Sequence, residues 1–356
     1  MNFDPSILPQ TGDTSLTAAL RRVVQRDPLH PAWVFQGQTV RYGDWAMQVQ
    51  NCRRQFAAWG IGPGDRVAVL ALAHPVQVTA LLALSELGAI WVPLNFRLAQ
   101  AEWQQIMRDS GACLLLADAE YTSAATQLAQ HCGVPLHAIS DLLTPGHEAA
   151  HPAQVLEPLP RASTPDPDSP VLLVYTSGTT GRPKGAMLTH LGIVHSSMHY
   201  AVAMGLGPQD CTITAVPLSH VTGLVALVTT FALCAGKLVI QSAFKAADFL
   251  RLAAAENMTH SLMVPAMYKL CLIDPGFDPQ ALTGWRIGGY GGAPMPVAVI
   301  EEMAQRMPAL ELMNCYGSTE TTSPATLMPQ GEQAAHLDSV GRALPCVDLV
   351  VVDEHG

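Results

Sequence analysis

The chain has few charged side chains and very few basic ones. Charged residues make up 13% of its 356 positions, only 19 are Lys or Arg, and the net charge is −10 at pH 7. A protein that binds a nucleic-acid backbone needs clustered basic residues to neutralise phosphates, and no long Lys or Arg run is present. We therefore expect no nucleic-acid partner. The hydrophobic fraction of 49% is instead sufficient for a large core and more than one compact unit.

The sequence also lacks signs of export or membrane insertion. Its eight cysteines are scattered with no C-x-x-C pair, which is typical of reduced, mostly buried thiols in a cytoplasmic protein. The segment Met1 to Leu16 has neither the basic flank nor the apolar core of a secretory signal. The most apolar stretch, Val221 to Gly236, is uncharged but short for a bilayer span, so we expect a buried helix and no transmembrane segment.

Strand-like and helix-like segments alternate along most of the chain. Arg66–Leu70 reads as a strand, Pro75–Leu87 as a helix and Ala89–Val92 as the next strand. This rhythm predicts parallel pairing with right-handed crossovers, and hence an α/β protein with helices covering largely parallel sheets. Residues 144–170 are rich in Pro and resemble a linker, whereas Asp348–Val352 is predicted to be a strand of a smaller β unit.

One loop, Tyr175 to Gly185, concentrates the chemistry. It follows the apolar run Val171–Val174 and contains Thr, Ser and Gly residues together with Lys184. Glycines let backbone amides approach an anion closely, and hydroxyls and the Lys add donors, which suits a polyphosphate. A simple Ser/Thr/Gly turn is the weaker alternative. The ATPase-type P-loop does not fit, because that motif requires Ser or Thr after Gly-Lys, and Gly185 follows Lys184 here. The candidate phosphate-binding residues are Thr176, Ser177, Gly178, Thr179, Thr180, Gly181 and Lys184.

The segment Thr176 to Gly185 resembles the signature loop of the adenylate-forming superfamily, which includes acyl-CoA synthetases, adenylation domains of nonribosomal peptide synthetases, and luciferases. The resemblance implies a large N-terminal domain of two packed αβ subdomains with mostly parallel, layered sheets, over residues 1–338. It places one subdomain at about 1–50 and 211–330 and the other at about 51–210. Residues 339–356 would then begin a truncated β subdomain.

Further segments match the family's motifs in their usual order. Pro217 to Gly223 resembles a motif whose His lies over the substrate carboxylate, which points to His220. Gly289 to Pro294 resembles the segment that wraps the adenine and lines the acyl pocket. Asn314 to Glu320 resembles the Y-G-x-T-E motif. The resemblance implies that the substrate pocket comprises His220, Val221, Thr222, Gly223, Tyr290, Gly291 and Ser318. It implies nucleotide contacts from Gly291, Gly292, Ala293, Pro294, Asn314, Cys315, Tyr316, Gly317 and Thr319.

The implied reaction joins a carboxylate to ATP as an acyl-adenylate, which a thiol such as CoA then attacks. The resemblance gives catalytic roles to Lys184, His220, Thr319 and Glu320, and a magnesium site to Glu320 and Thr180. Magnesium prefers carboxylate and phosphate oxygens. Because the segment Leu218–Leu224 carries no acid that could bind an α-ammonium group, a fatty or aryl acid is favoured over an amino acid.

Several alternatives stay open at this point. They are an amino-acid adenylation module, an acyl ligase that uses a carrier protein as acceptor, a homodimer, and a non-catalytic remnant. Family members continue through a T-G-D motif and a small C-terminal domain bearing a catalytic Lys, so we expect a truncated portion with weak activity. His195 and His199 have a spacing that can bind zinc, but no further ligand stands at a suitable offset, so a helical surface or core role is expected.

Overall fold

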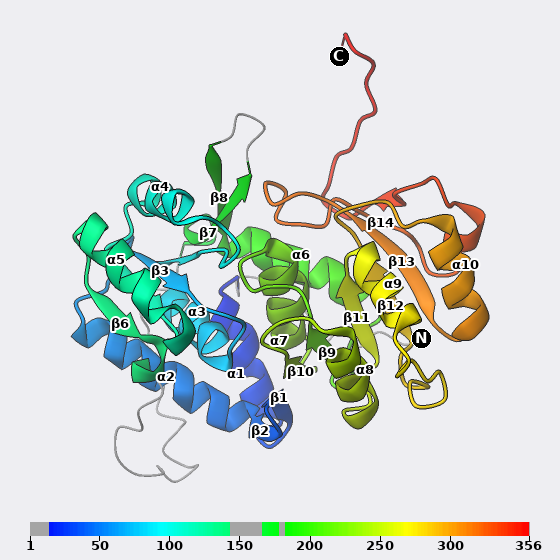
Figure 1. The fold of residues 1–356 in the computed structure, drawn as a ribbon, viewed down its shortest axis with the longest axis horizontal. Helices are drawn as coiled ribbons and strands as arrows, with labels where there is room; N and C mark the ends of the chain where they lie inside the picture. Colours follow the sequence, from blue (N-terminus) through cyan, green and yellow to red (C-terminus); the bar gives the residue numbers. More distant parts are fainter. Residues whose placement is uncertain (1–13, 143–165, 178–181, 356) are drawn as a thin grey trace.

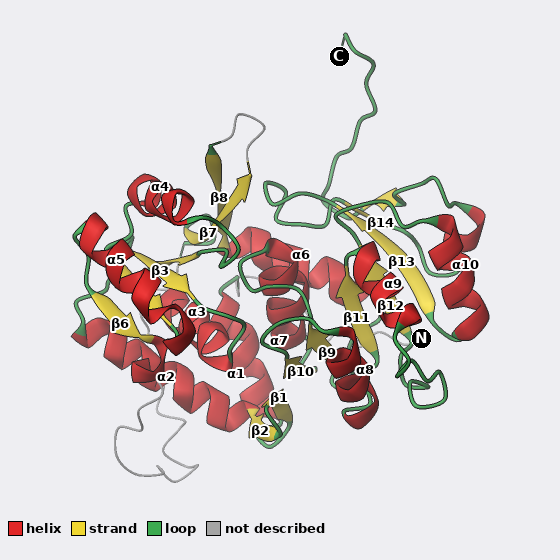
Figure 2. Ribbon diagram, viewed as in Figure 1, coloured by secondary structure: helices red, strands yellow, loops and turns green. Residues whose placement is uncertain are grey.

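Two β-sheets with helices between and outside them form the structure (Figure 1, Figure 2). It is a computed structural model that describes residues 14–142, 166–177 and 182–355. The six-stranded sheet consists of β3 (Arg66–Leu70), β4 (Ile90–Pro93), β5 (Leu114–Ala117), β6 (Leu136–Ala138), β7 (Pro170–Ser177) and β8 (Pro183–Thr189). The nine-stranded sheet consists of β1 (Pro31–Phe35), β2 (Gln38–Arg41), β9 (Cys211–Thr214), β10 (Lys237–Ile240), β11 (His260–Met263), β12 (Ile287–Tyr290), β13 (Glu311–Tyr316), β14 (Thr326–Leu327) and β15 (Arg342–Ala343).

Both sheets are mostly parallel. The strand orders are β6-β5-β3-β4-β7-β8 and β15-β14-β13-β12-β11-β9-β10-β1-β2. Antiparallel pairs lie at the sheet edges, where β8 pairs with β7, β2 with β1, and β14 with β13 and β15. The largely parallel α/β fold expected from the sequence is therefore confirmed. The expected division into two subdomains stays a prediction, although the two sheets draw their strands from residues 66–189 and from residues 31–41 plus 211–343.

Helices form three layers around the two sheets. They are α1 (Leu16–Arg26), α2 (Tyr42–Ala58), α3 (Pro75–Leu87), α4 (Gln100–Ser110), α5 (Thr122–Cys132), α6 (His190–Ala203), a π-helix (Thr222–Thr229), α7 (Thr230–Leu233), α8 (Ala246–Ala255), α9 (Pro265–Ile273) and α10 (Val297–Arg306). The core between the sheets includes side chains of α1, α2, α3, α6 and α7. On the outer faces, α4 and α5 pack on the six-stranded sheet and α8, α9 and α10 on the nine-stranded sheet.

The helix α3 shows how local sequence sets an element of the middle layer. It starts with Pro75, whose fixed φ suits the first helical turn, and the side chain of His74 accepts a hydrogen bond from the amide of Val76. It ends at Gly88, which adopts the left-handed conformation at φ 69°. Because α3 is apolar on nearly all sides, it is buried along almost its whole length between the two sheets.

The uncharged stretch Val221 to Gly236 is a buried helix, as predicted, but its first part is a π-helix. A Cβ atom on Gly223 would lie 2.5 Å from the carbonyl oxygen of Pro217, so only glycine fits at this start. Short π-helical segments often occur beside functional sites.

The prediction of a strand at Asp348–Val352 is wrong. The structure has no strand there, and Leu349 to Val352 are between 47% and 91% exposed. The stretch has strand-like composition, but a strand also needs a hydrogen-bonded neighbour, and β15 is the last strand of the nine-stranded sheet in the chain. The predicted linker at 144–170 lies mostly outside the described residues.

Candidate active site

A cavity of about 500 Å³ opens at the carboxyl ends of five neighbouring parallel strands. Residues that directly follow β9, β10, β11, β12 and β13 all contribute to its wall. In parallel α/β sheets the carboxyl edge is where ligands usually bind, because the loops there converge on a common crevice. The topology alone therefore places this cavity where a binding site is expected.

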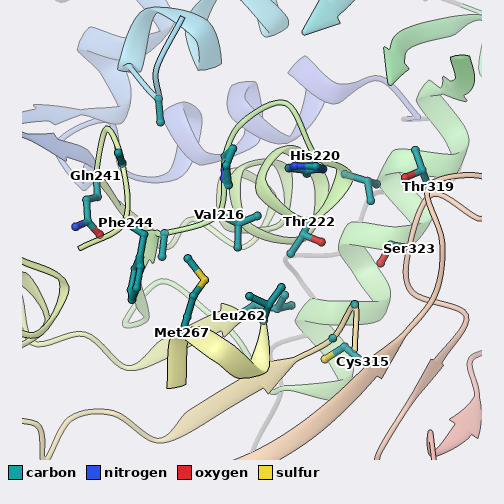
Figure 3. Close-up of a pocket in the computed structure, with 18 of the residues that line it drawn as sticks. Val216, His220, Thr222, Gln241, Phe244, Leu262, Met267, Cys315, Thr319 and Ser323 are labelled. Carbon is teal, nitrogen blue, oxygen red and sulfur yellow. The ribbon is translucent and has the colours of Figure 1, made fainter. Parts of the chain in front are cut away.

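The two ends of the cavity differ in chemistry (Figure 3). We call the end that holds His220, Thr222 and Thr319 the motif end. Phe244, Met267 and Gln241 lie on the opposite side of the view and form the far end. Between them the wall is lined mainly by apolar side chains such as Val216 and Leu262.

His220 sits on a tight turn between β9 and the π-helix. Its amide donates to the carbonyl of Pro217 (3.1 Å), and its carbonyl accepts from the amide of Leu224 (3.0 Å). The residue is exposed at the cavity wall, yet the surrounding protein lowers the pKa of the imidazole below 6.5, and the positive charge of Arg97 lowers the pKa further. The ring is therefore neutral at pH 7 and can donate one hydrogen bond.

The loop that carries Thr319 is held by α6. The side chain of Ser196 donates to the carbonyl of Thr322 (2.9 Å), and the hydroxyls of Tyr200 and Ser323 lie 3.0 Å apart. Thr322 has φ 59°, a left-handed conformation that is strained for a β-branched residue. Hydrogen bonds from α6 thus stabilise the strained conformation at Thr322, and this loop places Thr319 at the cavity wall.

Gly291 lets two strand ends meet closely. A Cβ at this position would overlap the carbonyl oxygen of Cys315, so no other residue fits without movement of the backbone. Gly292 follows at φ 78° and also lines the cavity. Cys315 is buried, and burial raises the pKa of its thiol well above the usual range, so it is an uncharged part of the wall.

The described residues of the predicted phosphate loop lie on β7 and β8, which pair antiparallel. Thr176 and Lys184 face each other across the two strands, and Lys184 is exposed. The hydroxyl of Tyr175, which pairs with Gly185 near the end of the hairpin, donates to Asp109 on α4 (2.6 Å) and ties the hairpin to that helix. Gly178, Thr179, Thr180 and Gly181 lie outside the described residues, as does the side chain of Ser177.

The structure brings together only part of the predicted site. Among the described residues, the predicted ones that line the cavity are His220, Val221, Thr222, Gly291, Gly292, Cys315, Gly317, Ser318 and Thr319. Tyr290, predicted for the substrate pocket, is instead buried in the core on the outer face of the nine-stranded sheet. Four other predicted residues are exposed in the loops beside the cavity: Glu320, Tyr316, Ala293 and Pro294. Gly223 is buried in the turn that carries His220. The side chain of Asn314 donates to the carbonyl of Ser339 (3.0 Å). The functional roles of all these residues stay predictions.

The sequence motifs did not indicate the residues of the far end or the positive charge of Arg97 in the cavity wall. Phe244, Met267 and Gln241 follow strands but match no motif, and Arg97 lies in the segment Pro93–Leu98 with no assigned role. Arg97 is the charged side chain among the described residues that line the cavity, and its guanidinium lies over the ring of Phe96 at 5.4 Å. The one available signal was position, since Gln241 directly follows β10, and Phe244 and Met267 each lie four residues after the end of β10 or β11.

The described part of the chain offers few side chains that could ligate a metal ion together. No group of three His, Cys, Asp or Glu side chains there could hold a metal ion. His195 and His199 both lie on α6 with ring centroids 6.3 Å apart, and burial lowers the pKa of His199. Glu320 is exposed on the loop beside Thr319, where one carboxylate fits a magnesium ion bound mainly by phosphate oxygens.

Comparison with known proteins gives consistent results. The family described as AMP-binding enzyme matches residues 20–356. A feruloyl-CoA synthase from an Amycolatopsis species is 31% identical over 311 residues, which cover 86% of this chain and 59% of that protein. The fatty acid–[acyl-carrier-protein] ligase ScoC of Streptomyces coeruleorubidus is 29% identical and covers 93% of this chain and 64% of its own length. The chain thus spans about three fifths of the length of these relatives.

Solved structures agree with the fold. The o-succinylbenzoate CoA synthetase of Bacillus subtilis, in complex with ATP and magnesium ion, superposes with a TM-score of 0.79 at 27% identity. The match covers 92% of this chain and 65% of that one. None of the described helices of this chain is long and apolar enough to cross a bilayer.

Proposed function

Since the chain belongs to the AMP-binding enzyme family, as the loop and motifs indicated, we propose that it is the large domain of an enzyme that activates a carboxylic acid. The acid reacts with ATP to give an acyl-adenylate and pyrophosphate, and a thiol then attacks the acyl carbon, forms a thioester and releases AMP. The observation that carries this proposal is the cavity at the five strand ends, with a polar motif end and a remainder lined mainly by apolar side chains.

The lining of the cavity favours a fatty or aryl acid over an amino acid. Among the described residues that line it, none is Asp or Glu, so no carboxylate is available to pair with an α-ammonium group. Phe244, Met267 and Leu262 instead offer an apolar surface. The feruloyl-CoA synthase relative supports an aryl acid and the ScoC relative a fatty acid.

The motif end supplies the polar contacts. Neutral His220 can donate to a carboxylate oxygen, and the Thr319 hydroxyl can donate to a phosphate oxygen, while Arg97 adds positive charge beside them. No general base is needed, because a carboxylate is already a nucleophile. Lys184 and the loop residues Thr176 to Gly181 would bind the polyphosphate. Glu320 would hold magnesium with Thr180, and the ion would neutralise phosphate charge.

CoA is the proposed acceptor, with a carrier protein as the alternative because ScoC is named for one. A cytoplasmic location is part of the proposal, and all eight cysteines are free in the structure.

Calorimetric titration with an acyl-sulfamoyl adenosine, a stable mimic of an acyl-adenylate, tests the proposal. We expect saturable binding that Thr319→Ala weakens tenfold or more, because a hydrogen bond to a charged group contributes about 1.5–3 kcal/mol. The matched control Thr283→Ala removes an exposed threonine that does not line the cavity, and it leaves the affinity unchanged. Absence of binding by the unmodified chain, or equal loss in both variants, would contradict the proposal.

A further inference from the structure

Gln241 is an under-satisfied polar group at the far end of the cavity. It directly follows β10 and is 7% exposed, and its amide donates to the hydroxyl of Thr214 at 3.3 Å. In the side chain, Nε2 makes one long contact of 3.4 Å to the carbonyl of Lys245, and Oε1 has no hydrogen-bond partner. Buried polar atoms are normally paired, so a carboxamide in this state calls for an explanation.

Gln241 differs in its position from the other buried polar side chains that lack a hydrogen-bond partner. Among the described residues, several side chains carry such an atom, including Gln48, Gln77 and Gln333. Of all of them, Gln241 is the one that lines the 500 Å³ cavity. Figure 3 shows it beside Phe244 and on the opposite side of the view from His220 and Thr319. The carboxamide is therefore placed where the end of a bound acyl group would arrive.

We infer that Gln241 selects acids that carry a hydroxyl group at the end remote from the carboxylate. This inference rests on the proposed function, because it assumes that the carboxylate binds at the motif end. A hydroxyl can donate to Oε1 and accept from Nε2, so it satisfies both deficits of one carboxamide. An acid without such a group leaves Oε1 without a partner.

The side chain needs only a small rearrangement to make this contact. Oε1 is covered in the structure, so a ligand reaches it after the carboxamide turns about its terminal torsion. That torsion is broad in glutamine, and the bond it gives up is the 3.4 Å contact to Lys245. The gain is a well-formed hydrogen bond at a buried position, where such bonds discriminate between ligands that have and lack the matching group.

The test compares matched pairs of acyl-sulfamoyl adenosines by calorimetry. Three pairs differ only in the distal hydroxyl and vary its reach: 4-hydroxybenzoyl and benzoyl, 4-hydroxycinnamoyl and cinnamoyl, and 8-hydroxyoctanoyl and octanoyl. We expect the hydroxylated member of at least one pair to bind about tenfold more tightly, the discrimination typical of one buried hydrogen bond. Gln241→Met should abolish that preference and leave the affinity for the unhydroxylated member unchanged or higher.

Gln77→Met is the matched control, since Gln77 is also buried (3% exposed against 7% for Gln241), has an unpaired Oε1 and does not line this cavity. It should leave the hydroxyl preference intact. Equal binding within all three pairs, or a preference that survives Gln241→Met, would overturn the inference while leaving the proposed function standing. Failure of the unmodified chain to bind any of the six analogues would instead overturn the proposed function.

Discussion

The two ends of the cavity are built in different ways. The motif end consists of glycines and hydroxyl residues in closely packed loops. At Gly223 and Gly291 a neighbouring backbone carbonyl leaves no space for a side chain. The far end is formed by the side chains of residues such as Phe244 and Met267 that line the wall. On the proposed function, the adenylation chemistry would take place at the motif end and substrate choice would be made by the side chains of the far end.

The largest effect should come from adding one carbon atom at the motif end. In Gly291→Ala the new Cβ meets the carbonyl of Cys315, so the ends of β12 and β13 must separate. We expect the free energy of unfolding to fall by about 1–3 kcal/mol, as for other overpacked sites. Binding of an acyl-sulfamoyl adenosine should fall at least a hundredfold, as measured by thermal unfolding and calorimetry.

The control for that prediction is Gly62→Ala, where a Cβ would meet nothing within 4 Å. It should shift the unfolding temperature by no more than about two degrees, and it should leave the affinity for the acyl-sulfamoyl adenosine unchanged. If Gly291→Ala behaved like Gly62→Ala, the backbone constraint attributed to the motif end would be absent.

A smaller and more selective effect is expected at the far end. Met267→Trp fills space beside Phe244, so an acyl-sulfamoyl adenosine should bind about tenfold to a hundredfold more weakly, which corresponds to about 1.4–2.8 kcal/mol. AMP, which has no acyl group, should bind as before. Calorimetry with both ligands measures the two effects, and Met187→Trp, at a residue 73% exposed, serves as the control. Equal weakening of both ligands would show that the two ends are not separable.

The smallest effect concerns the charge of His220. Desolvation by the surrounding protein and then the charge of Arg97 lower the pKa of its imidazole, because each disfavours the protonated form. Arg97→Gln removes the positive charge but not the desolvation by the surrounding protein, so the pKa should rise and remain below 6.5. NMR titration of the imidazole protons measures this. Arg108→Gln, at an arginine whose guanidinium lies 3.0 Å from His131, should leave the His220 titration unchanged, and a pKa of His220 above 6.5 in the unmodified chain would contradict the account.

The motif end was largely predictable from sequence. Its residues stand in fixed order with glycines at positions where a side chain would clash, so His220, Gly291 and Thr319 could be named before their positions were known. The alternating fold was predictable for a similar reason, because strand and helix periodicities differ and β3, α3 and β4 follow each other at short spacing.

The far end was not predictable, because nothing local marks it. Gln241 and Met267 line the same cavity because β10 and β11 lie on either side of β9. That strand order depends on contacts between residues that are far apart in the sequence. Tyr290 illustrates the converse: it stands next to a motif glycine, but alternation along β12 directs its ring into the opposite core. The exposed stretch Leu349 to Val352 shows that apolar composition without a partner strand does not make a strand.

A crystal structure of the chain with a bound acyl-sulfamoyl adenosine tests the central claim most directly. The account predicts the sulfamoyl group beside His220 and Thr319, and the acyl chain running between Phe244 and Met267 toward Gln241. An acyl group bound outside this cavity, or pointing away from the far end, would contradict it.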